Sequence, residues 1–411
     1  MKFKAKLTKF NLFSGNVEGD IELIDEEEET QEDKPTPPEP EIDETPAPEP
    51  PIDVPGNPEL TDLVDKAATA QTMKVYKELQ EARGKYVYFG QMEYCFNHQW
   101  RLPDQSFKMT GKHPKVLGVD KDDYDLTDSV FPSGGLIGKE YFESGIRKHA
   151  DAGGYVMFMS GMPNLVGTGE PGKAKPKARN DRTGDPVNAF LPGGSHRNAF
   201  VNHVKKLAHY FANLKDSSGK PIPVLYRLFH EMDGSWDWWG TRNSTPEKFK
   251  KLWIDVFNIF KSQGTHNIIW VWAPGFYKYH EGVQFDTYYP GNDYVDIIGV
   301  DRYEKHADGT AQILKDHYYT LPDSEAKKRG KVFIIAEGMR KLSTGKKISK
   351  YWTDGLMLPV KRSIQAGGIQ PAALVVYFTM RAPRWGPRVN QWDSKSFVEM
   401  VKDPFVKMLG D

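Results

Sequence analysis

Two glutamates follow apolar, β-branched segments in the second half of the chain. Glu231 ends the run VLYRLFHE, and Glu337 follows the run VFIIA. Two carboxylates flanking a glycosidic bond hydrolyse it, one by giving a proton to the leaving oxygen and the other by attacking the anomeric carbon or activating water. A salt bridge at the rim of the fold is the alternative for either glutamate alone. The pair favours catalysis, because Trp236, Trp238 and Trp239 lie nearby in sequence and tryptophan stacks on the apolar face of a pyranose.

Eight short runs rich in β-branched and aromatic residues predict the strands that position these glutamates. They are near-continuously apolar, which is typical of parallel strands buried on both faces. The runs cover residues 86–91, 115–120, 155–160, 224–231, 268–274, 295–301, 332–338 and 373–379, and amphipathic helical stretches lie at 139–152, 197–214, 246–263 and 349–366. Eight strands alternating with helices predict an α/β fold, a (β/α)8 TIM barrel, with a doubly wound open sheet as the alternative. In a barrel, the ends of the fourth and seventh strands meet at one mouth.

Charge divides the chain into three segments. The net charge is +4 over residues 1–17, −15 over 18–53 and +10 from residue 54 onward, which together give the total of −1. Residues 25–58 combine an acidic run with ten prolines, so they are predicted to form an acidic, proline-rich, disordered linker. Residues 1–24 alternate apolar residues with lysines around Ser-Gly-Asn, which predicts a short β-hairpin, either a frayed terminus or an anchor for a protein partner. The barrel is then expected over residues 59–411.

Several other kinds of site are set aside. Cys95 is the single cysteine, so neither an intrachain disulfide nor a cysteine metal cluster can form. The segment GTGEPGK at 167–173 has phosphate-loop spacing, but Ala174 replaces the hydroxyl residue that would hold magnesium. Gly234 stands where a zinc motif beginning at His230 would need its second histidine. The basic stretch 173–182 is interpreted as a solvated loop. We therefore expect no metal, no organic cofactor and no nucleic-acid partner.

The lengths of the apolar stretches indicate whether the chain has a transmembrane helix or a signal peptide. The chain has no stretch of about 18 apolar residues, so no transmembrane helix is expected. The segment MKFKAKLTKF lacks the apolar core of a signal peptide. Because β-linked polysaccharides lie outside cells, three hypotheses for localisation follow: cleavage before this numbering begins, export by another route, or attachment to a particle such as a phage virion through residues 1–24.

Five segments in order resemble glycoside hydrolase family 26, the β-mannanase family of a retaining barrel clan. The clearest is RLFHEMDGSWDWWG at 227–240. The others are LPGGS at 191–195, FKKLW at 249–253, HNIIWVWAPG at 266–275 and YYPGNDYVDIIGVDRYE at 288–304. The resemblance extends from about Tyr86 to Phe378. It implies the (β/α)8 fold and retaining hydrolysis of a β-linked polysaccharide without a metal or organic cofactor.

The resemblance also implies roles for individual residues. Glu231 is the expected general acid/base and Glu337 the expected nucleophile. His230 is expected to hydrogen-bond near the nucleophile and the sugar, Tyr303 to hydrogen-bond the nucleophile, and Trp236 to form part of the sugar platform. In a retaining enzyme the two carboxyl groups should lie about 5–5.5 Å apart.

The chain departs from the family pattern at three places. Ser160 and Gly161 stand where the family has a sugar-contacting histidine after the third strand, and Ala336 replaces the threonine before the nucleophile. After the eighth strand, Arg381 and Trp385 are candidate substrate-binding residues in place of the usual Trp-Arg pair. These departures bear on substrate choice more than on the hydrolysis itself.

Three functional hypotheses follow. The first is a retaining endo-1,4-β-mannanase acting on mannan, galactomannan and glucomannan. The second is a glycanase for another β-linked polymer, such as a β-glucan, a β-1,3-xylan or a bacterial capsule, motivated by Gly161 and the basic main domain. The third is a non-catalytic carbohydrate-binding or structural barrel, which has no need to retain both glutamates.

Overall fold

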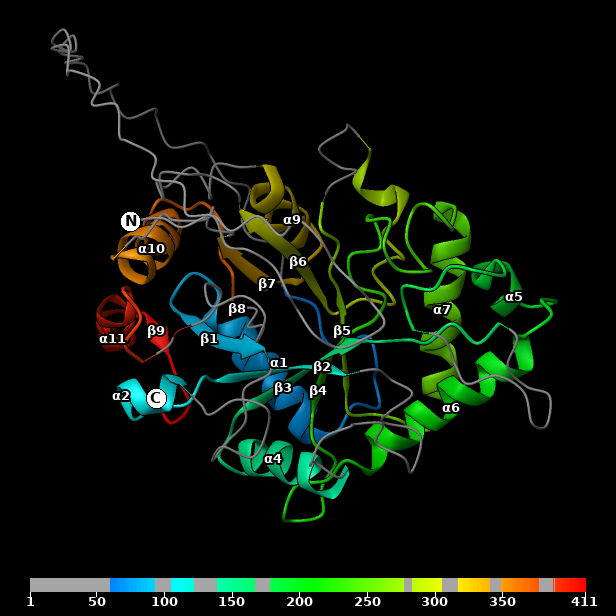
Figure 1. Ribbon diagram of the computed structural model, residues 1–411, viewed down its shortest axis with the longest axis horizontal. Helices are drawn as coiled ribbons and strands as arrows, with labels where there is room; N and C mark the ends of the chain where they lie inside the picture. Colours follow the sequence, from blue (N-terminus) through cyan, green and yellow to red (C-terminus); the bar gives the residue numbers. More distant parts are fainter. Residues whose placement is uncertain are drawn as a thin grey trace, which may run out of the picture. The chain divides into compact units, whose positions relative to one another are not determined.

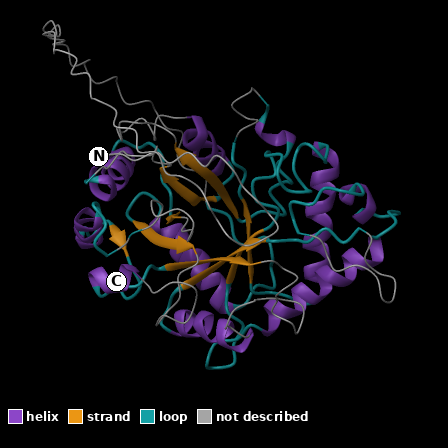
Figure 2. Ribbon diagram, in the orientation of Figure 1, coloured by secondary structure: helices purple, strands orange, loops and turns teal. Residues whose placement is uncertain are grey.

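Eight parallel strands close into a barrel with helices around it (Figures 1 and 2). The computed structural model describes residues 60–92, 105–121, 139–166, 178–276, 283–304, 317–340, 349–376, 387 and 389–411. The hairpin expected at 1–24 and the linker expected at 25–58 lie outside these residues. The closed order β2-β3-β4-β5-β6-β7-β8-β1, completed by pairing of β1 with β2, confirms the (β/α)8 barrel and rules out the open sheet.

The strands agree with the apolar runs of the sequence. They are β1 Val87–Met92, β2 Val116–Lys121, β3 Tyr155–Ser160, β4 Val224–Arg227, β5 Ile268–Trp272, β6 Ile297–Glu304, β7 Val332–Arg340 and β8 Ala373–Val376, and the short β9 Val406–Lys407 pairs with the start of β1. The largest difference is in β4. It ends at Arg227, whereas the sequence predicted a strand as far as Glu231.

The predicted helices are also present. The α-helices are α1 Ala70–Ala82, α2 Gln105–Thr110, α4 Lys139–Asp151, α5 Pro186–Phe190, α6 Arg197–Asn213, α7 Pro246–Ser262, α9 His317–Lys328, α10 Leu358–Gln365 and α11 Ser394–Lys402, with a 3-10 turn η2 Phe285–Thr287 and a π-helix η4 Tyr351–Met357. The stretch predicted at 349–366 is thus divided between η4 and α10. Within the described ranges, no helix is long and apolar enough to cross a membrane.

Alternate residues of each strand face opposite sides of the barrel wall. Leu225 belongs to a buried cluster that fills the interior together with Ile269 and Val332. Its neighbour Tyr226 instead lies against the helices, with its ring 5.8 Å from that of Phe260 on α7. Each large apolar side chain buried in this way contributes about 1.5–3 kcal/mol, which explains why the strands lack polar alternation.

Helix α1 closes the end of the barrel at which the strands begin. Tyr76 on α1 donates a hydrogen bond to the backbone oxygen of Asp296, 3.1 Å away. The buried carboxylate of Asp296 accepts from the backbone N–H of Val64 and from that of Trp270, each at 2.8 Å. One aspartate therefore joins the chain before α1 to the wall of the barrel.

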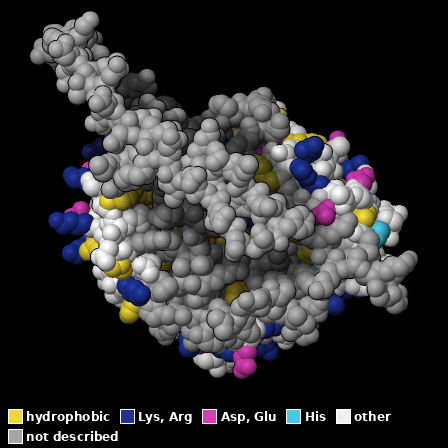
Figure 3. Space-filling model, viewed as in Figure 1, with side chains coloured by type: hydrophobic (Ala, Val, Ile, Leu, Met, Phe, Trp, Pro, Cys, Tyr) yellow, Lys and Arg dark blue, Asp and Glu magenta, His cyan; other side chains and the backbone are white. Residues whose placement is uncertain are grey.

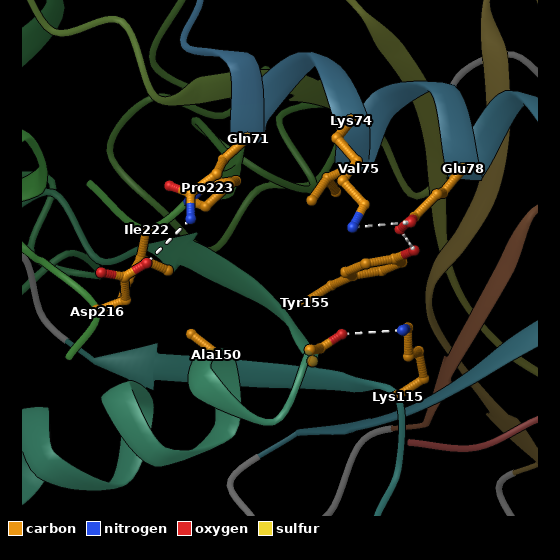
Figure 4. Close-up of a pocket in the computed structure, with 12 residues that line it drawn as sticks. Gln71, Lys74, Val75, Glu78, Lys115, Ala150, Tyr155, Asp216, Ile222 and Pro223 are labelled. Carbon is orange, nitrogen blue, oxygen red and sulfur yellow. Dashed lines mark hydrogen bonds and ion pairs between the residues drawn. The ribbon is translucent and has the colours of Figure 1, made fainter. Parts of the chain in front are cut away.

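A pocket of about 250 Å³ lies beside α1 at this same end (Figure 4). Its polar side chains are hydrogen-bonded within the protein: Gln71 donates to Asp216 at 2.9 Å, Tyr155 donates to Glu78, and Lys115 donates to the backbone oxygen of Gly153 at 2.8 Å. The pocket lies at the opposite end of the barrel from the two glutamates singled out in the sequence.

Candidate active site

Glu231 lies in a strained turn after β4 and not on the strand itself. Phe229 has φ +44° and Glu231 has φ +48°. This left-handed conformation costs a residue with a side chain about 1–2 kcal/mol. Hydrogen bonds offset that cost: the N–H of Glu231 donates to the backbone oxygen of Ala273 at 2.9 Å, and its own backbone oxygen accepts from Gly234 at 2.8 Å. Strain held in this way is typical of active sites.

The turn is also fixed by aromatic packing. The Phe229 ring lies 5.6 Å from that of Trp238 and 5.5 Å from that of Trp239. Because these rings are fully buried, the backbone on both sides of His230 has little freedom to move.

Glu337 reaches the site through a β-bulge in β7. Val300 of β6 pairs with Ile335, whereas Asp301 pairs with Glu337, so Ala336 is one extra residue in β7. Ala336 faces the interior cluster. Simple alternation would therefore turn the next residue outward, toward the helices. The bulge changes this alternation and brings Glu337 alongside Asp301.

Arg227 joins these two carboxylates. It occupies the inward position two residues after Leu225 and is fully buried. Its Nη2 donates to Oε2 of Glu337 at 2.9 Å and also to Oδ2 of Asp301. Burial opposes the positive charge, but Asp301 and Glu337 together raise the pKa of the guanidinium. A fixed cation thus lies beside the expected nucleophile.

The carboxyl group of Glu231 has a pKa well above its ordinary value. Burial is the main cause, the negative charge of Glu337 is the next, and the charge of Asp301 adds to both. Arg227 acts in the opposite direction but does not cancel these effects. Glu231 therefore tends to keep its proton, as a general acid must.

His230 is a buried, neutral imidazole. Burial lowers its pKa well below the ordinary value, and the charges of Arg179 and Arg227 lower it further. The ring hydrogen-bonds the backbone of Ser160, and its Nδ1 has no hydrogen-bond partner among the described residues. A neutral imidazole retains one nitrogen lone pair that can accept a hydrogen bond.

The three tryptophans that follow Glu231 differ in their exposure to solvent. Trp236 is 40% exposed, whereas Trp238 and Trp239 are completely buried. The indole N–H groups of the buried pair donate to the backbone oxygens of Met162 at 2.8 Å and of His230 at 2.9 Å. Only Trp236 presents a surface to a ligand, and the other two support the turn.

The remaining predicted residues are only partly described. The backbone of Tyr303 lies in β6, two residues after Asp301, and its side chain is outside the described part. Arg381 and Trp385 also lie outside it. The Oγ atom of Ser160 accepts a hydrogen bond from Tyr226, which faces the helices, at 3.3 Å. By alternation the buried Gly161 is therefore the next residue to face the mouth.

Arg227 and Asp301 are the site residues that the sequence analysis missed. A signal was available, because both are charged residues at inward-facing positions of apolar runs, and a buried charge requires a partner of opposite sign. Among the described residues, no group of three or more His, Cys, Asp and Glu side chains could hold a metal ion.

Comparisons with known proteins place this geometry in a family. Residues 64–334 match the model described as glycosyl hydrolase family 26. Over 309 residues the chain is 26% identical to a mannan endo-1,4-β-mannosidase of Bifidobacterium adolescentis, covering 71% of this chain and 30% of that protein. A mannan endo-1,4-β-mannosidase of Thermothelomyces thermophilus is 27% identical over 248 residues, 59% of this chain and 46% of that one. The chain thus spans less than half the length of these curated relatives.

Solved structures of similar fold include two enzymes described as mannanases. A modular endo-β-1,4-mannanase from Cellulomonas fimi matches with a TM-score of 0.72 at 24% identity, covering 85% of this chain and 77% of that one. A β-mannanase from Bacteroides ovatus matches with a TM-score of 0.70 at 22% identity, covering 84% and 96%. These likenesses support the barrel fold.

Proposed function

Because this chain belongs to glycoside hydrolase family 26, we propose that it is a retaining endo-β-glycanase whose substrate is a β-1,4-linked mannan, including galactomannan and glucomannan. The observation that carries the proposal is the buried charge cluster. Glu231 is biased to keep its proton, and Glu337 lies in the same cluster against the guanidinium of Arg227. One acid and one charge-compensated carboxylate are what a double displacement needs.

In the first step, a carboxylate oxygen of Glu337 attacks the anomeric carbon while Glu231 gives its proton to the departing glycosidic oxygen. The C–O bond to the leaving sugar breaks, and a covalent glycosyl-enzyme remains. In the second step, Glu231, now ionised, takes a proton from water, and the resulting hydroxide oxygen attacks the anomeric carbon. The ester bond to Glu337 breaks, and both glutamates return to their starting states.

The neighbouring residues bind and orient the sugar in this proposal. His230 hydrogen-bonds the sugar near the nucleophile, and Trp236 stacks on a pyranose face. Tyr303 hydrogen-bonds the nucleophile, and Arg381 and Trp385 contact the substrate from the segment after β8.

A glycanase for a different β-linked polymer is the second candidate. Gly161, at the mouth-facing position after β3, leaves more space than a side chain would. The chain from residue 54 onward carries a net charge of +10, and lysine and arginine side chains are spread around the edge of the view in Figure 3. Such a charge attracts an anionic polymer by long-range steering.

Reducing-end release from galactomannan, glucomannan, β-glucan, xylan and an anionic capsule tests these candidates. The variants are Glu337→Ala and Glu231→Ala, and the exposed Glu140→Ala on α4 is a matched control that also removes one carboxylate. We expect wild type and the control to cleave the mannans, Glu337→Ala to be inactive, and Glu231→Ala to act only on aryl glycosides with good leaving groups.

Each other outcome has a distinct meaning. Cleavage of another polymer alone would retain the mechanism and replace the substrate. Binding of a glycan without cleavage of any would support a carbohydrate-binding barrel. Full activity in Glu337→Ala would refute the two-carboxylate assignment.

A further inference from the structure

The exposed Trp236 belongs to a loop that a distant segment holds on both sides. The platform loop is residues 232–241, and the clamp segment is residues 178–184. Nη1 of Arg182 donates to the backbone oxygen of Ser235, immediately before Trp236. On the other side, the N–H of Trp238 donates to the backbone oxygen of Arg179 at 3.0 Å. The clamp segment therefore contacts the platform loop both before and after the tryptophan.

A side-chain contact reinforces the second of these attachments. Nε of Arg179 lies 3.7 Å from Oδ1 of Asp237, whose carboxylate is largely buried. Both ends of the short stretch around Trp236 are thus tied to arginine residues of the clamp segment.

The clamp segment is in turn fixed to the barrel by Asn164. This side chain is fully buried just after β3. Its Nδ2 donates to the backbone oxygens of Asp181 and Thr183, each at 2.9 Å, and its Oδ1 accepts from the N–H of Val166 at 2.9 Å. One buried amide therefore joins the clamp segment to the residues that follow β3.

The ring of Trp236 is supported from beneath by Gly234. A Cβ atom at this position would lie 2.3 Å from Cζ2 of Trp236, so the ring packs directly on the glycine backbone. One surface of the indole is occupied in this way, and the side chain remains 40% exposed. The backbone of the platform loop therefore determines the direction in which the open surface points.

We infer that Asn164 and Arg182 are positioning residues for substrate binding, acting through the clamp segment to hold Trp236 in the orientation that a glycan requires. The inference rests on the proposed function, because it takes Trp236 as a sugar platform. A ring that is already in place loses less conformational freedom on binding, which improves affinity. Arg227, Asp301 and Glu337 are held by β4, β6 and β7, and the backbone N–H of Glu231 is held by Ala273 after β5, so we expect the chemical step to change little.

The test compares Arg182→Ala with Arg242→Ala, which removes the same charge from an exposed residue directly after the platform loop. Hydrogen–deuterium exchange of the amides of residues 235–241 is measured first, and then kcat and KM on galactomannan. In Arg182→Ala we expect faster exchange and a KM raised roughly threefold to tenfold, with kcat within about twofold of wild type. Arg242→Ala should match wild type in both measurements.

Asn164→Asp is the second variant, because it retains the size and the Oδ1 acceptor while removing the Nδ2 donor. It should change exchange and KM in the same direction as Arg182→Ala. Unchanged exchange in Arg182→Ala, or a fall in kcat at constant KM, would overturn the inference. If neither wild type nor any variant cleaves mannan, but exchange rises in Arg182→Ala and Asn164→Asp and stays at the wild-type rate in Arg242→Ala, the proposed substrate fails and the clamp of the platform loop is retained.

Discussion

Asp301 on β6 stands in register with Glu337 on β7, and both carboxylates accept hydrogen bonds from the same nitrogen of Arg227. The pairing depends on the β-bulge at Ala336, because in a regular ladder Asp301 would pair with Ala336 itself. Two acids and one guanidinium are thereby concentrated in a buried volume, where electrostatic interactions are stronger than in water. Burial raises the pKa of Glu231, and the negative charges of Glu337 and Asp301 raise it further.

The alkaline limb of the pH–rate profile should belong to Glu231. Its raised pKa means that the acid form persists at pH values where an ordinary glutamate is ionised, and activity should fall as pH rises through that pKa, because the leaving oxygen then receives no proton. Glu231→Ala should lose this limb on an aryl glycoside with a good leaving group. The measurement is kcat/KM against pH for both proteins, and an alkaline limb that persists in Glu231→Ala would assign the proton to another group.

Removing Arg227 should destabilise the barrel strongly. Arg227→Met leaves Asp301 and Glu337 buried without the cation that both contact, and breaking a buried pair in this way costs about 3–5 kcal/mol. Adding Asp301→Asn should recover part of the loss, because one of the two uncompensated charges is then gone. Denaturant unfolding of the two single variants and the double variant measures this coupling.

Arg197→Met is the matched control for that cycle. Arg197 also pairs with a carboxylate, Asp255, but both side chains are partly exposed, and exposed pairs contribute only about 0–1 kcal/mol. Equal losses in Arg227→Met and Arg197→Met would contradict the role assigned to the buried cluster.

The sequence predicted the barrel well because its strands are apolar on both faces, a pattern that requires no knowledge of tertiary contacts. The sequence also predicted a strand-end position for each of the two glutamates, and the structure modifies both positions. Glu231 was expected on a strand and lies in a left-handed turn that tertiary packing stabilises. Glu337 was expected at a regular strand end, although alternation alone directs it outward and only the bulge at Ala336 brings it inward. Neither a bulge nor a positive φ at a glutamate has a local sequence signal.

Other parts of the site depend on contacts between residues far apart in the chain. The sequence placed Trp236, Trp238 and Trp239 in one group, yet two of them are core residues whose indole groups bond to backbone oxygens. Neither Asn164 nor Arg182 belongs to a recognisable sequence motif. Their importance arises from hydrogen bonds to loop segments, which no pattern of apolar residues specifies.

Gly234→Ala should weaken glycan binding while leaving the protein folded. The added methyl group would lie 2.3 Å from Cζ2 of Trp236, so the ring must move and its exposed surface must change direction. We expect KM on the polymer to rise several-fold, with little change in kcat on a small aryl glycoside. Gly219→Ala is the control, since nothing lies within 4 Å of a Cβ there and only stability should fall. A KM equal to that of wild type in Gly234→Ala would argue against Trp236 as the platform.

Asp296 should make the stability of the barrel depend on pH. Burial raises the pKa of Asp296 from 3.8 to about 6, even though two backbone N–H groups and Lys331 favour its charged form. Because the folded pKa is higher than the unfolded one, the folded state binds more protons between these values, and the free energy of unfolding should decrease as pH rises from about 4 to 6. The full change is at most about 3 kcal/mol, and no further loss from this group is expected above that range.

The substitution Asp296→Asn separates this effect from other titrating groups. It should abolish the contribution of residue 296 to the pH dependence and cost about 1–3 kcal/mol at neutral pH, because one of the two N–H groups, from Val64 or Trp270, loses its acceptor. Urea unfolding between pH 4 and pH 7.5 measures both quantities, with the exposed Asp293→Asn as the control. Parallel pH curves for wild type and Asp296→Asn would show that the buried carboxyl group contributes no pH dependence in this range and would contradict the prediction.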